Sequence, residues 1–497
     1  MHYILSKQLS SVGIDPKNPN LDLQAFALFL KTVSDTYGTF DLKKSALEDS
    51  LATSSSKVDF LDSHDKLTGL PSRYIATKYL QNAIELAKNQ RLGNAVLFLD
   101  LDDFTKVNDS YGHERGDEIL KLISKRLQSC VRANDKIART GGDEFIITLG
   151  NLRHEYEARE VAENILSALQ IGSPVSGTEV ICTASIGMAY TEEDDENPDE
   201  LIGNADLAMR SAKLTGKCRV IQYHPSMKDA AIERLTIENH LRSAIEQEEL
   251  SVVYQPLYNL PTNELIGAEA LCRWKSPTLG HVSPAHFIPI AEESGLIIDI
   301  GYWVLKKVCQ EMAEWRKSHK ADHLVISVNL SGRQIAQGDV ADRVSATLLE
   351  TGLRPKNLKL EITESYLMSD SEGTIKTLES LRKLGMKLAI DDFGTGYSSL
   401  SLLSTLPVDT VKIDQSFIKN LDQDQSARVV VKAIVAIAQS MNLDVTCEGI
   451  ETESQQTFVK EAGCATGQGY FFSTPLESKD FEELIIRSQN SKFQEVA

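Results

Sequence analysis

Eight short apolar runs recur between about residues 248 and 485, roughly 20 to 35 residues apart, with helical patterns between them. Runs of this kind with crossover-length spacers are typical of parallel strands, and eight of them favour a (β/α)₈ TIM-type barrel. The runs are VVYQPL, LIGAEAL, LVISVNL, LKLEITE, KLAIDDF, TVKID, DVTCEGI and QGYFF. The sequence therefore predicts a single barrel in the C-terminal part of the chain.

Polar side chains gather at the carboxyl ends of these runs. In a barrel, these ends open at one mouth, where active sites of this architecture lie. Carboxylates that meet in one cavity repel each other unless cations neutralise them. The residues are Glu269, Asn329, Glu361, Glu364, Asp391, Asp392, Lys412 and Glu448. Together they predict a divalent metal site, although each acidic residue alone has the alternative role of capping a helix or turn.

The ligand types indicate which metal binds. No His or Cys residues converge with these oxygen ligands, and the adjacent Asp391 and Asp392 are placed to bridge two ions. Hard oxygen ligands favour Mg²⁺ or Mn²⁺ over zinc. Two such ions about 4 Å apart activate a water and stabilise the attacking and leaving oxygens in phosphodiester hydrolysis. The pattern predicts a phosphodiesterase with two ions per active site.

This stretch resembles the EAL domain, the cyclic di-GMP phosphodiesterase family. The matching strings are YQPL, EALCRW, VNLS, LEITES, DDFGTGYSSL, VKIDQSFI, CEGIET and GQGYFFSTP, in the family's order. The resemblance implies hydrolysis of cyclic di-GMP to linear pGpG. No implied ligand is substituted, which favours an active hydrolase over a receptor that only binds the nucleotide.

The resemblance also implies a role for each matching position. One ion would be held by Glu269, Asn329, Glu361 and Asp391, and the other by Asp391, Asp392 and Glu448. Lys412 would orient the attacking water or help to deprotonate it. The substrate would contact Gln255 and Arg273 and lie near Gln468, and Glu364 would brace the DDFGTG loop.

Residues 62–225 alternate short apolar strands with amphipathic helices, which is typical of an α/β or α+β domain. The segment DKIARTGGDEFIITL predicts a hairpin around Gly141 and Gly142. Asp100 follows an upstream apolar strand, and Asp143 and Glu144 lie at the hairpin tip. These carboxylates predict a metal and nucleotide site. A surface hairpin with a charged tip is the alternative.

The same residues resemble a GGDEF domain, the diguanylate cyclase family, whose α+β fold is similar to adenylyl cyclase and polymerase palms. DKLTGLPSR, NDSYGHERGDEIL, RTGGDEF and ADLAMRSAKLTGK carry the match. The resemblance implies that Asp100, Asp143 and the Leu101 carbonyl bind metal, and that Glu144 helps to deprotonate the 3′-hydroxyl. It implies that Asn108 and Asp117 read guanine, that Lys213 and Lys217 hold phosphates, and that Arg132 and Asp135 form the product-inhibition site.

One position departs from the family pattern. Thr105 stands where a phosphate-contacting lysine is usual, and the nearest lysine, Lys106, is displaced by one residue. Loss of one cation from a triphosphate site weakens binding by about 1 to 3 kcal/mol. Cyclase activity therefore stays open at this stage, while GTP binding is expected.

Composition excludes other classes of function. The formal charge of −19 over 497 residues argues against a nucleic-acid polymer as partner. We expect no membrane span and no signal peptide, because the chain has no long apolar run. The seven cysteines are scattered without CxxC spacing, which argues against structural disulfides and zinc and favours a cytoplasmic location.

Residues 1–60 carry a short heptad-like pattern that predicts a helical signalling or dimerisation segment, with a helical hairpin packed on the next domain as the alternative. A GGDEF domain (62–225), a linker helix (226–247) and an EAL domain (248–485) would follow. We expect a cyclic di-GMP phosphodiesterase whose GGDEF domain binds GTP and either regulates or synthesises the nucleotide. Because cyclisation joins two GTP molecules, one per GGDEF domain, a homodimer is expected. A bifunctional enzyme with net cyclase activity and a silent receptor are the rival hypotheses.

Overall fold

The computed structural model describes residues 63–88, 92–175, 178–191, 197–319, 321–367, 371–395 and 403–495, with isolated positions Lys7, Ser10, Ser11, Leu28 and Lys31. The predicted heptad segment therefore lies almost wholly outside the described residues. The chain divides into two compact units, Met1–Ala231 and Ile232–Ala497. None of the helices in the described ranges has the length and apolar character that crossing a bilayer requires.

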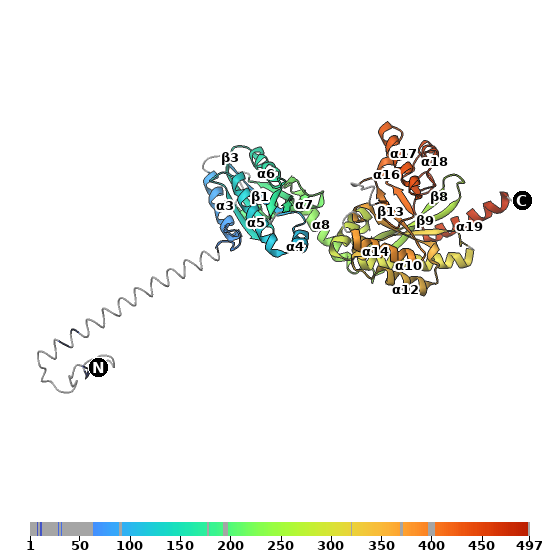
Figure 1. Cartoon of the computed structure of the whole chain (residues 1–497), viewed down its shortest axis with the longest axis horizontal. Coiled ribbons are helices and arrows are strands. Elements are labelled where there is room, and N and C mark those ends of the chain that lie inside the picture. The colour runs from blue at the N-terminus through green and yellow to red at the C-terminus, as the bar shows by residue number, and fades with distance from the viewer. Residues whose placement is uncertain are drawn as a thin grey trace. The chain divides into compact units, whose positions relative to one another are not determined.

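The N-terminal unit, coloured blue to green in Figure 1, is built around a sheet with helices packed against it. The sheet has five strands in the order β2-β3-β1-β6-β7, and only β6 and β7 run parallel. Its elements are α3 (Arg73–Lys88), β1 (Gly93–Leu101), α4 (Phe104–Tyr111), α5 (His113–Cys130), β2 (Lys136–Gly141), β3 (Glu144–Leu152), α6 (Glu155–Leu169), β4 (Ser173–Val175), β5 (Thr178–Val180), β6 (Ala184–Tyr190), α7 (Pro198–Leu214) and β7 (Val220–Gln222). The predicted hairpin is confirmed, since β2 and β3 pair across the Gly141-Gly142 turn.

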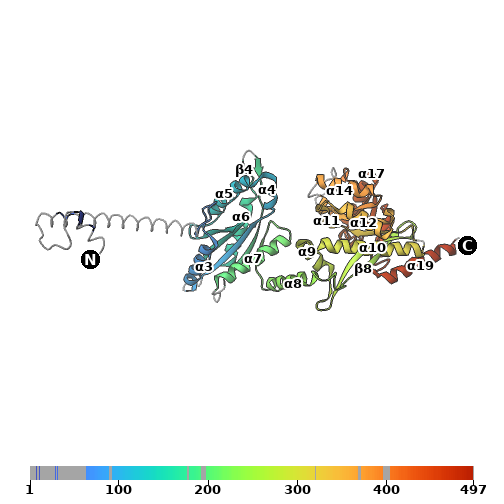
Figure 2. The same cartoon turned by 90° about the horizontal axis from the view of Figure 1, so that it is seen from below.

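The central strand β1 is buried on both faces, and its alternating side chains explain why. Leu97 and Leu99 pack with residues of α5 and α6, whereas Val96 and Phe98 pack with residues of α3 and α7. Helices therefore cover both faces of the sheet, with α5 and α6 on one face and α3 and α7 on the other (Figure 2). This layering leaves the carboxyl end of β1, with Asp100, next to the β2–β3 turn.

Helix α8 (Ser226–Leu241) crosses the boundary between the two units and is followed by turns. The C-terminal unit then contains β8 (Leu250–Asn259), β9 (Leu265–Ser276), β10 (Gly280–Val282), α9 (Pro284–Ser294), α10 (Ile297–His319), β11 (Val325–Asn329), α11 (Gly332–Ala336), α12 (Val340–Thr351), η1 (Pro355–Asn357), β12 (Leu358–Thr363), α13 (Glu364–Leu367), α14 (Ser371–Lys383), β13 (Lys387–Phe393), β14 (Thr410–Ile413), α16 (Gln415–Lys419), α17 (Gln425–Ser440), β15 (Asp444–Cys447), α18 (Glu453–Glu461), β16 (Thr466–Gly467), β17 (Leu476–Glu477) and α19 (Ser478–Glu495).

The predicted eight-stranded barrel is confirmed, because pairing runs β9-β11-β12-β13-β14-β15-β16-β8 and closes again on β9. The strand β8 differs from the expectation, since it runs antiparallel to both β9 and β16. Only Leu260–Glu264 joins β8 to β9, and a parallel pair needs a crossover of a dozen or more residues. A hairpin is the geometry that such a short connection allows.

Two details at the C-terminal end differ from the predicted strands. The last barrel strand is β16, and the following QGYFF segment forms a turn instead of a strand. Gly469 has a φ of +156°, and a Cβ there would lie 2.1 Å from the Ile450 carbonyl oxygen, so this turn requires glycine. Helix α19 also continues to Glu495, past the end at residue 485 that we expected for the EAL domain.

Candidate active sites in the two units

A single buried lysine lies at the centre of the barrel. Lys412 on β14 is 1% exposed, and its Nζ lies 3.1 Å from Glu269 Oε2, 2.9 Å from Asp391 Oδ1 and 2.5 Å from Glu448 Oε1. The same ammonium forms an ion pair with Glu361. Four carboxylates that the sequence placed far apart therefore surround one positive charge, and the cluster keeps an excess of negative charge.

Parallel strand pairing explains this convergence. Glu269, Glu361 and Asp391 lie on β9, β12 and β13, and Glu448 directly follows β15. Register pairs such as Asn329 with Glu361 hold neighbouring strands level. Carboxylate oxygens of Glu269, Glu361 and Asp391 lie within 4.8 Å of one another, which is close enough to share one metal ion.

Two amide side chains complete the surroundings of Glu269. Asn329 Nδ2 donates a hydrogen bond to Glu269 Oε1 at 2.9 Å, and Gln468 Nε2 donates to Glu269 Oε2 at 2.7 Å. Burial alone would raise the pKa of Glu269, but Lys412 and the two amides hold that pKa below its ordinary value. Glu269 is therefore held as a carboxylate.

The other acids of this cluster are less favourably placed. Burial, together with repulsion from Glu269 and Asp391, raises the pKa of Glu361 to about 7. Burial also raises the pKa of Glu448 well above its ordinary value. Burial would lower the pKa of Lys412, but the surrounding carboxylates outweigh that effect and raise its pKa well above normal. A protein with this arrangement binds an added cation readily, because four carboxylates share one ammonium.

The remaining predicted residues of this site surround the cluster. Gln255 on β8 pairs in register with Glu269. Asp392 is exposed and has a φ of 55°, a left-handed conformation that is sparsely populated outside glycine and is often found at functional sites. The Glu364 carboxylate is 1% exposed and accepts a hydrogen bond from the Gly394 N–H at 2.8 Å. Arg273 is half-buried on β9 and donates to the Cys272 carbonyl.

The N-terminal unit holds a second acidic cluster at the end of β1. Asp100 pairs in register with Glu144 across β1 and β3, and the Leu101 N–H donates to the Asp143 carbonyl at 3.3 Å. Glu144 accepts a hydrogen bond from Thr140 at 2.9 Å. The predicted metal-binding residues of this unit are thus brought together at one edge of the sheet.

Lysines accompany this cluster too. Lys213 on α7 lies 2.6 Å from Asp100 Oδ1. Burial nevertheless raises the pKa of Asp100 to about 6, with Asp143 and Glu144 adding repulsion. The positive charge of Lys213 therefore only partly offsets the burial of Asp100 and its repulsion from Asp143 and Glu144.

A separate acid, Asp103, holds the other two lysines of interest. Its carboxylate lies 2.9 Å from Lys217 Nζ and 3.1 Å from Lys106 Nζ. Lys106 therefore forms an ion pair with Asp103, three residues before it in the chain. The lysine that is displaced by one residue from Thr105 is already engaged with an acid of its own chain.

Comparisons with known proteins assign both units. Residues 238–475 match the EAL domain family and residues 62–219 match the diguanylate cyclase GGDEF domain family. The chain is 31% identical to the solved EAL enzyme Bd1971, with a TM-score of 0.50. The aligned region covers 62% of this chain and 82% of that one. The chain belongs to the GGDEF–EAL family.

Two further relatives have the same tandem. The chain is 40% identical over 439 residues to the bifunctional diguanylate cyclase/cyclic di-GMP phosphodiesterase MucR of Pseudomonas aeruginosa. The aligned region covers 88% of this chain but only 64% of MucR. The chain thus spans less than two thirds of that relative. The S helix–GGDEF–EAL structure of Vibrio cholerae LapD is 18% identical with a TM-score of 0.58, covers 85% of this chain and 99% of that one, and shows the shared fold.

The other predicted residues of the GGDEF unit lie on α4, on α5 and in the turn before β2. Asn108 on α4 lies over Gly116 of α5, where a Cβ would approach the Asn108 Oδ1 to 2.0 Å, and Asp117 is exposed next to that glycine. Asp135 is 9% exposed, and its oxygens accept hydrogen bonds from the Arg132 and Gly150 N–H groups. The Asp135 carboxylate thus stabilises its own turn, while the Arg132 side chain is 66% exposed.

Sequence reasoning assigned no role to a pair that braces the GGDEF hairpin. Arg139 donates from Nε to the Gly142 carbonyl at 3.0 Å, and its Nη1 lies 2.8 Å from Asp65 Oδ1. Both residues stand in motifs that carried the family resemblance. The arginine in the RTGGDEF motif was the available signal, but the sequence does not reveal a partner 74 residues away.

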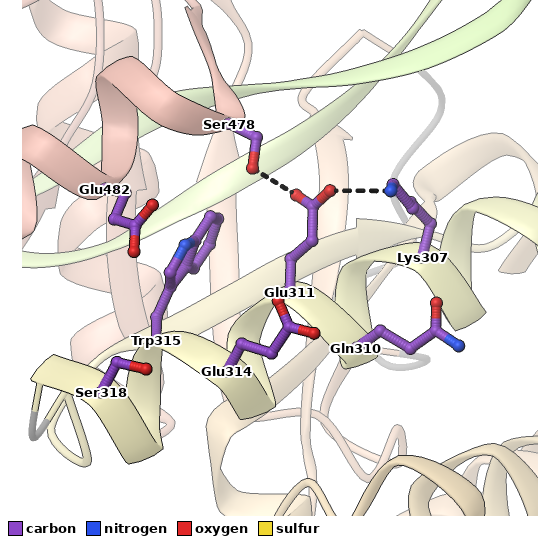
Figure 3. A pocket seen from close by; sticks show the side chains of 8 residues that line it. All are labelled: Lys307, Gln310, Glu311, Glu314, Trp315, Ser318, Ser478 and Glu482. Carbon is purple, nitrogen blue, oxygen red and sulfur yellow. Dashed lines mark hydrogen bonds and ion pairs between the residues drawn. The ribbon is translucent and has the colours of Figure 1, made fainter.

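A polar cavity of about 550 Å³ lies outside the barrel wall of the EAL unit, along α10 and the start of α19 (Figure 3). Glu311 points into it and is bonded to Ser478 at 2.8 Å, Lys307 at 3.1 Å and Tyr254 at 2.7 Å. None of the predicted site residues lines this cavity. Tyr254 precedes Gln255 on β8, and successive strand residues face opposite sides, so the cavity and the acidic cluster lie on opposite faces of that strand.

Proposed function

We propose that the EAL unit hydrolyses cyclic di-GMP to linear pGpG. One observation carries the proposal: the Lys412 ammonium lies within ion-pair distance of Glu269, Glu361, Asp391 and Glu448 at the mouth of a closed barrel. An arrangement that gathers carboxylates around one ammonium at a barrel mouth suits the transfer of a phosphoryl group to water. Relatives named for this activity support the choice of substrate.

The donor set fits divalent metal ions. The Gln468 side-chain oxygen is buried and has no hydrogen-bond partner within the described part of the chain, and all candidate ligands are oxygens. We propose two ions, Mg²⁺ or Mn²⁺, of which one would be held by Glu269, Asn329, Glu361 and Asp391 and the other by Asp391, Asp392 and Glu448. When bound, such ions would activate water and offset negative charge at the phosphodiester.

The remaining residues position the reactants. Lys412 keeps its proton because carboxylates surround it, so it would orient the attacking water as a donor rather than remove a proton. Gln255 and Arg273 would contact the nucleotide, with Gln468 near it. Glu364 would fix the DDFGTG loop by accepting the Gly394 N–H.

For the GGDEF unit we propose GTP binding, with Asp100, Asp143 and the Leu101 carbonyl at the metal, Glu144 at the 3′-hydroxyl, Asn108 and Asp117 at guanine, and Lys213 and Lys217 at the phosphates. The cluster at the end of β1 supports this assignment. Cyclisation would require a homodimer that places two GGDEF units face to face. Arg132 and Asp135 stay a predicted product-inhibition site, and the free cysteines suit the proposed cytoplasmic location.

The domain boundaries, 1–60, 62–225, 226–247 and 248–485, remain part of this proposal. The proposed hydrolysis is tested by chromatography of the products formed from cyclic di-GMP with Mg²⁺ or Mn²⁺. We expect pGpG from the parent chain and none from Glu269→Gln. Tight nucleotide binding without turnover under either metal would instead identify a receptor.

The same chromatography tests the GGDEF unit. GTP is supplied to an Asp392→Ala variant, in which any cyclic di-GMP would survive. Appearance of cyclic di-GMP would identify a bifunctional enzyme, and its absence with measurable GTP binding would identify a regulatory unit.

A further inference from the structure

Two buried thiols meet at the carboxyl end of β15. Cys447 is the last residue of β15, and Cys464 lies in the turn between α18 and β16. They are 0% and 2% exposed, and their sulfur atoms lie 3.1 Å apart. A disulfide needs about 2.05 Å between sulfurs, so a contraction of about 1 Å separates this pair from a covalent bond.

The backbone already holds the two cysteines together. Cys447 pairs in register with Gly467, and the Ala465 N–H donates to the Val445 carbonyl at 3.2 Å. The Cys464 N–H is bonded to the Val459 carbonyl at 3.0 Å, at the end of α18. Closing the pair therefore needs a local adjustment rather than unfolding.

Cys447 is linked to two residues of the acidic site. Glu448 follows Cys447 directly and lies 2.5 Å from Lys412 Nζ. The Gln468 N–H donates to the Cys447 carbonyl at 2.9 Å, while the Gln468 side chain donates to Glu269. A contraction at the sulfurs therefore shifts the backbone from which Glu448 and Gln468 extend.

We propose that Cys447 and Cys464 form a peroxide-sensitive dithiol whose oxidation to a disulfide slows the chemistry of the EAL unit. One sulfur attacks hydrogen peroxide, which forms an S–O bond, breaks the O–O bond and releases water. The second sulfur then attacks the resulting sulfenic acid, which forms the S–S bond, breaks the S–O bond and releases a second water. Two thiols are oxidised and one peroxide is reduced, with both thiol protons leaving in water.

Burial slows the first step, because the thiolate is the attacking form and forms poorly in an apolar environment. The small size and neutrality of hydrogen peroxide suit a buried target. The pair would therefore respond to sustained oxidant rather than to brief exposure. The expected effect on hydrolysis rests on the proposed function, whereas the disulfide itself does not.

The test treats the reduced full-length chain with hydrogen peroxide, blocks free thiols by alkylation and maps peptides by mass spectrometry without reduction. We expect a peptide that links Cys447 to Cys464, a fall of about tenfold or more in cyclic di-GMP hydrolysis, and recovery of both after a thiol reductant. Cys464→Ala, or Cys447→Ala if the first variant folds poorly, should form no linked peptide and keep its activity after peroxide. Cys309→Ala, at a buried cysteine of α10, is the matched control and should respond as the parent does.

Two outcomes would overturn the proposal. One is an unlinked pair under conditions that oxidise the half-buried Cys218; the other is a linked peptide with an unchanged rate. If the reduced chain fails to hydrolyse cyclic di-GMP, the proposed function fails. The linked peptide then still decides whether the dithiol exists.

Discussion

In the EAL unit four carboxylates share one lysine that is 1% exposed, whereas in the GGDEF unit Lys213 and Lys217 pair with two different acids and are each more than a third exposed. The EAL cluster comes from parallel barrel strands whose ends must meet. The GGDEF cluster comes from a strand end, a hairpin and a helix that contribute to one open edge. The comparison teaches that the first cluster is fixed by the fold, while the second depends on which side chains reach the edge.

The largest expected effect breaks the shared cation of the EAL cluster. Lys412→Met should lower cyclic di-GMP hydrolysis by about 10²- to 10³-fold, because a buried donor at the reacting group is lost. The metal-free variant should also lose about 3 to 5 kcal/mol of stability, since buried carboxylates keep no counter-charge. Steady-state kinetics and urea unfolding measure the two effects. Lys387→Met removes a half-exposed lysine from β13 and is the control; similar losses in both variants would contradict the prediction.

The pH dependence of stability sharpens the comparison next. Because the pKa of Glu361 is raised from 4.5 to about 7, its contribution to stability is present below pH 4.5 and is lost as the pH rises to about 7. Glu361→Gln should remove this decline, on the order of 3 kcal/mol in metal-free protein. The three tryptophans, Trp274, Trp303 and Trp315, all lie in the EAL unit, so their fluorescence follows its unfolding alone.

Asp100→Asn is the counterpart in the other unit. The pKa of Asp100 is raised from 3.8 to about 6, so its contribution is lost over that lower range. Its effect should be seen by circular dichroism and not by tryptophan fluorescence. The proposed role of Glu361 would be excluded if the free energy of unfolding, followed by tryptophan fluorescence, changed equally between pH 5 and 8 in Glu361→Gln and the parent.

A gain of function tests the open edge of the GGDEF unit. Thr105→Lys should tighten GTP binding by about tenfold, because one more cation reaches the phosphates. Titration calorimetry with Mg²⁺ measures the affinity. Lys106→Met is the matched control and should change little, since Asp103 already holds Lys106. A loss of GTP affinity of about tenfold in Lys106→Met would mean that Lys106 contacts the nucleotide.

The smallest effect concerns the loop brace. Glu364→Gln keeps an acceptor for the Gly394 N–H but loses its charge, which weakens that hydrogen bond by about 1 kcal/mol and should lower kcat/KM by about fivefold. Glu379→Gln, on the exposed side of α14, should behave as the parent does. Equal rates for Glu364→Gln and the parent would remove Glu364 from the site.

The barrel, the hairpin and the convergence of Glu269, Glu361, Asp391 and Glu448 followed from the sequence, because strand order and period dictate where carboxyl ends lie. The direction of β8 was also encoded, in the short connection Leu260–Glu264, but the pattern of eight similar runs concealed it. Side-chain pairing was not accessible. Neither the capture of Lys106 by Asp103 nor the bond between Arg139 and Asp65 follows from spacing, because both depend on which rotamers meet in the folded chain.

The position of Lys412 has a consequence for the order in which the protein is assembled. Its ammonium is a permanent counter-charge, so the EAL barrel has a route to close before any ion arrives. Chelation is then expected to yield a folded, silent protein that regains activity when ions return. The supply of metal ions would thus switch the activity of an already folded protein reversibly.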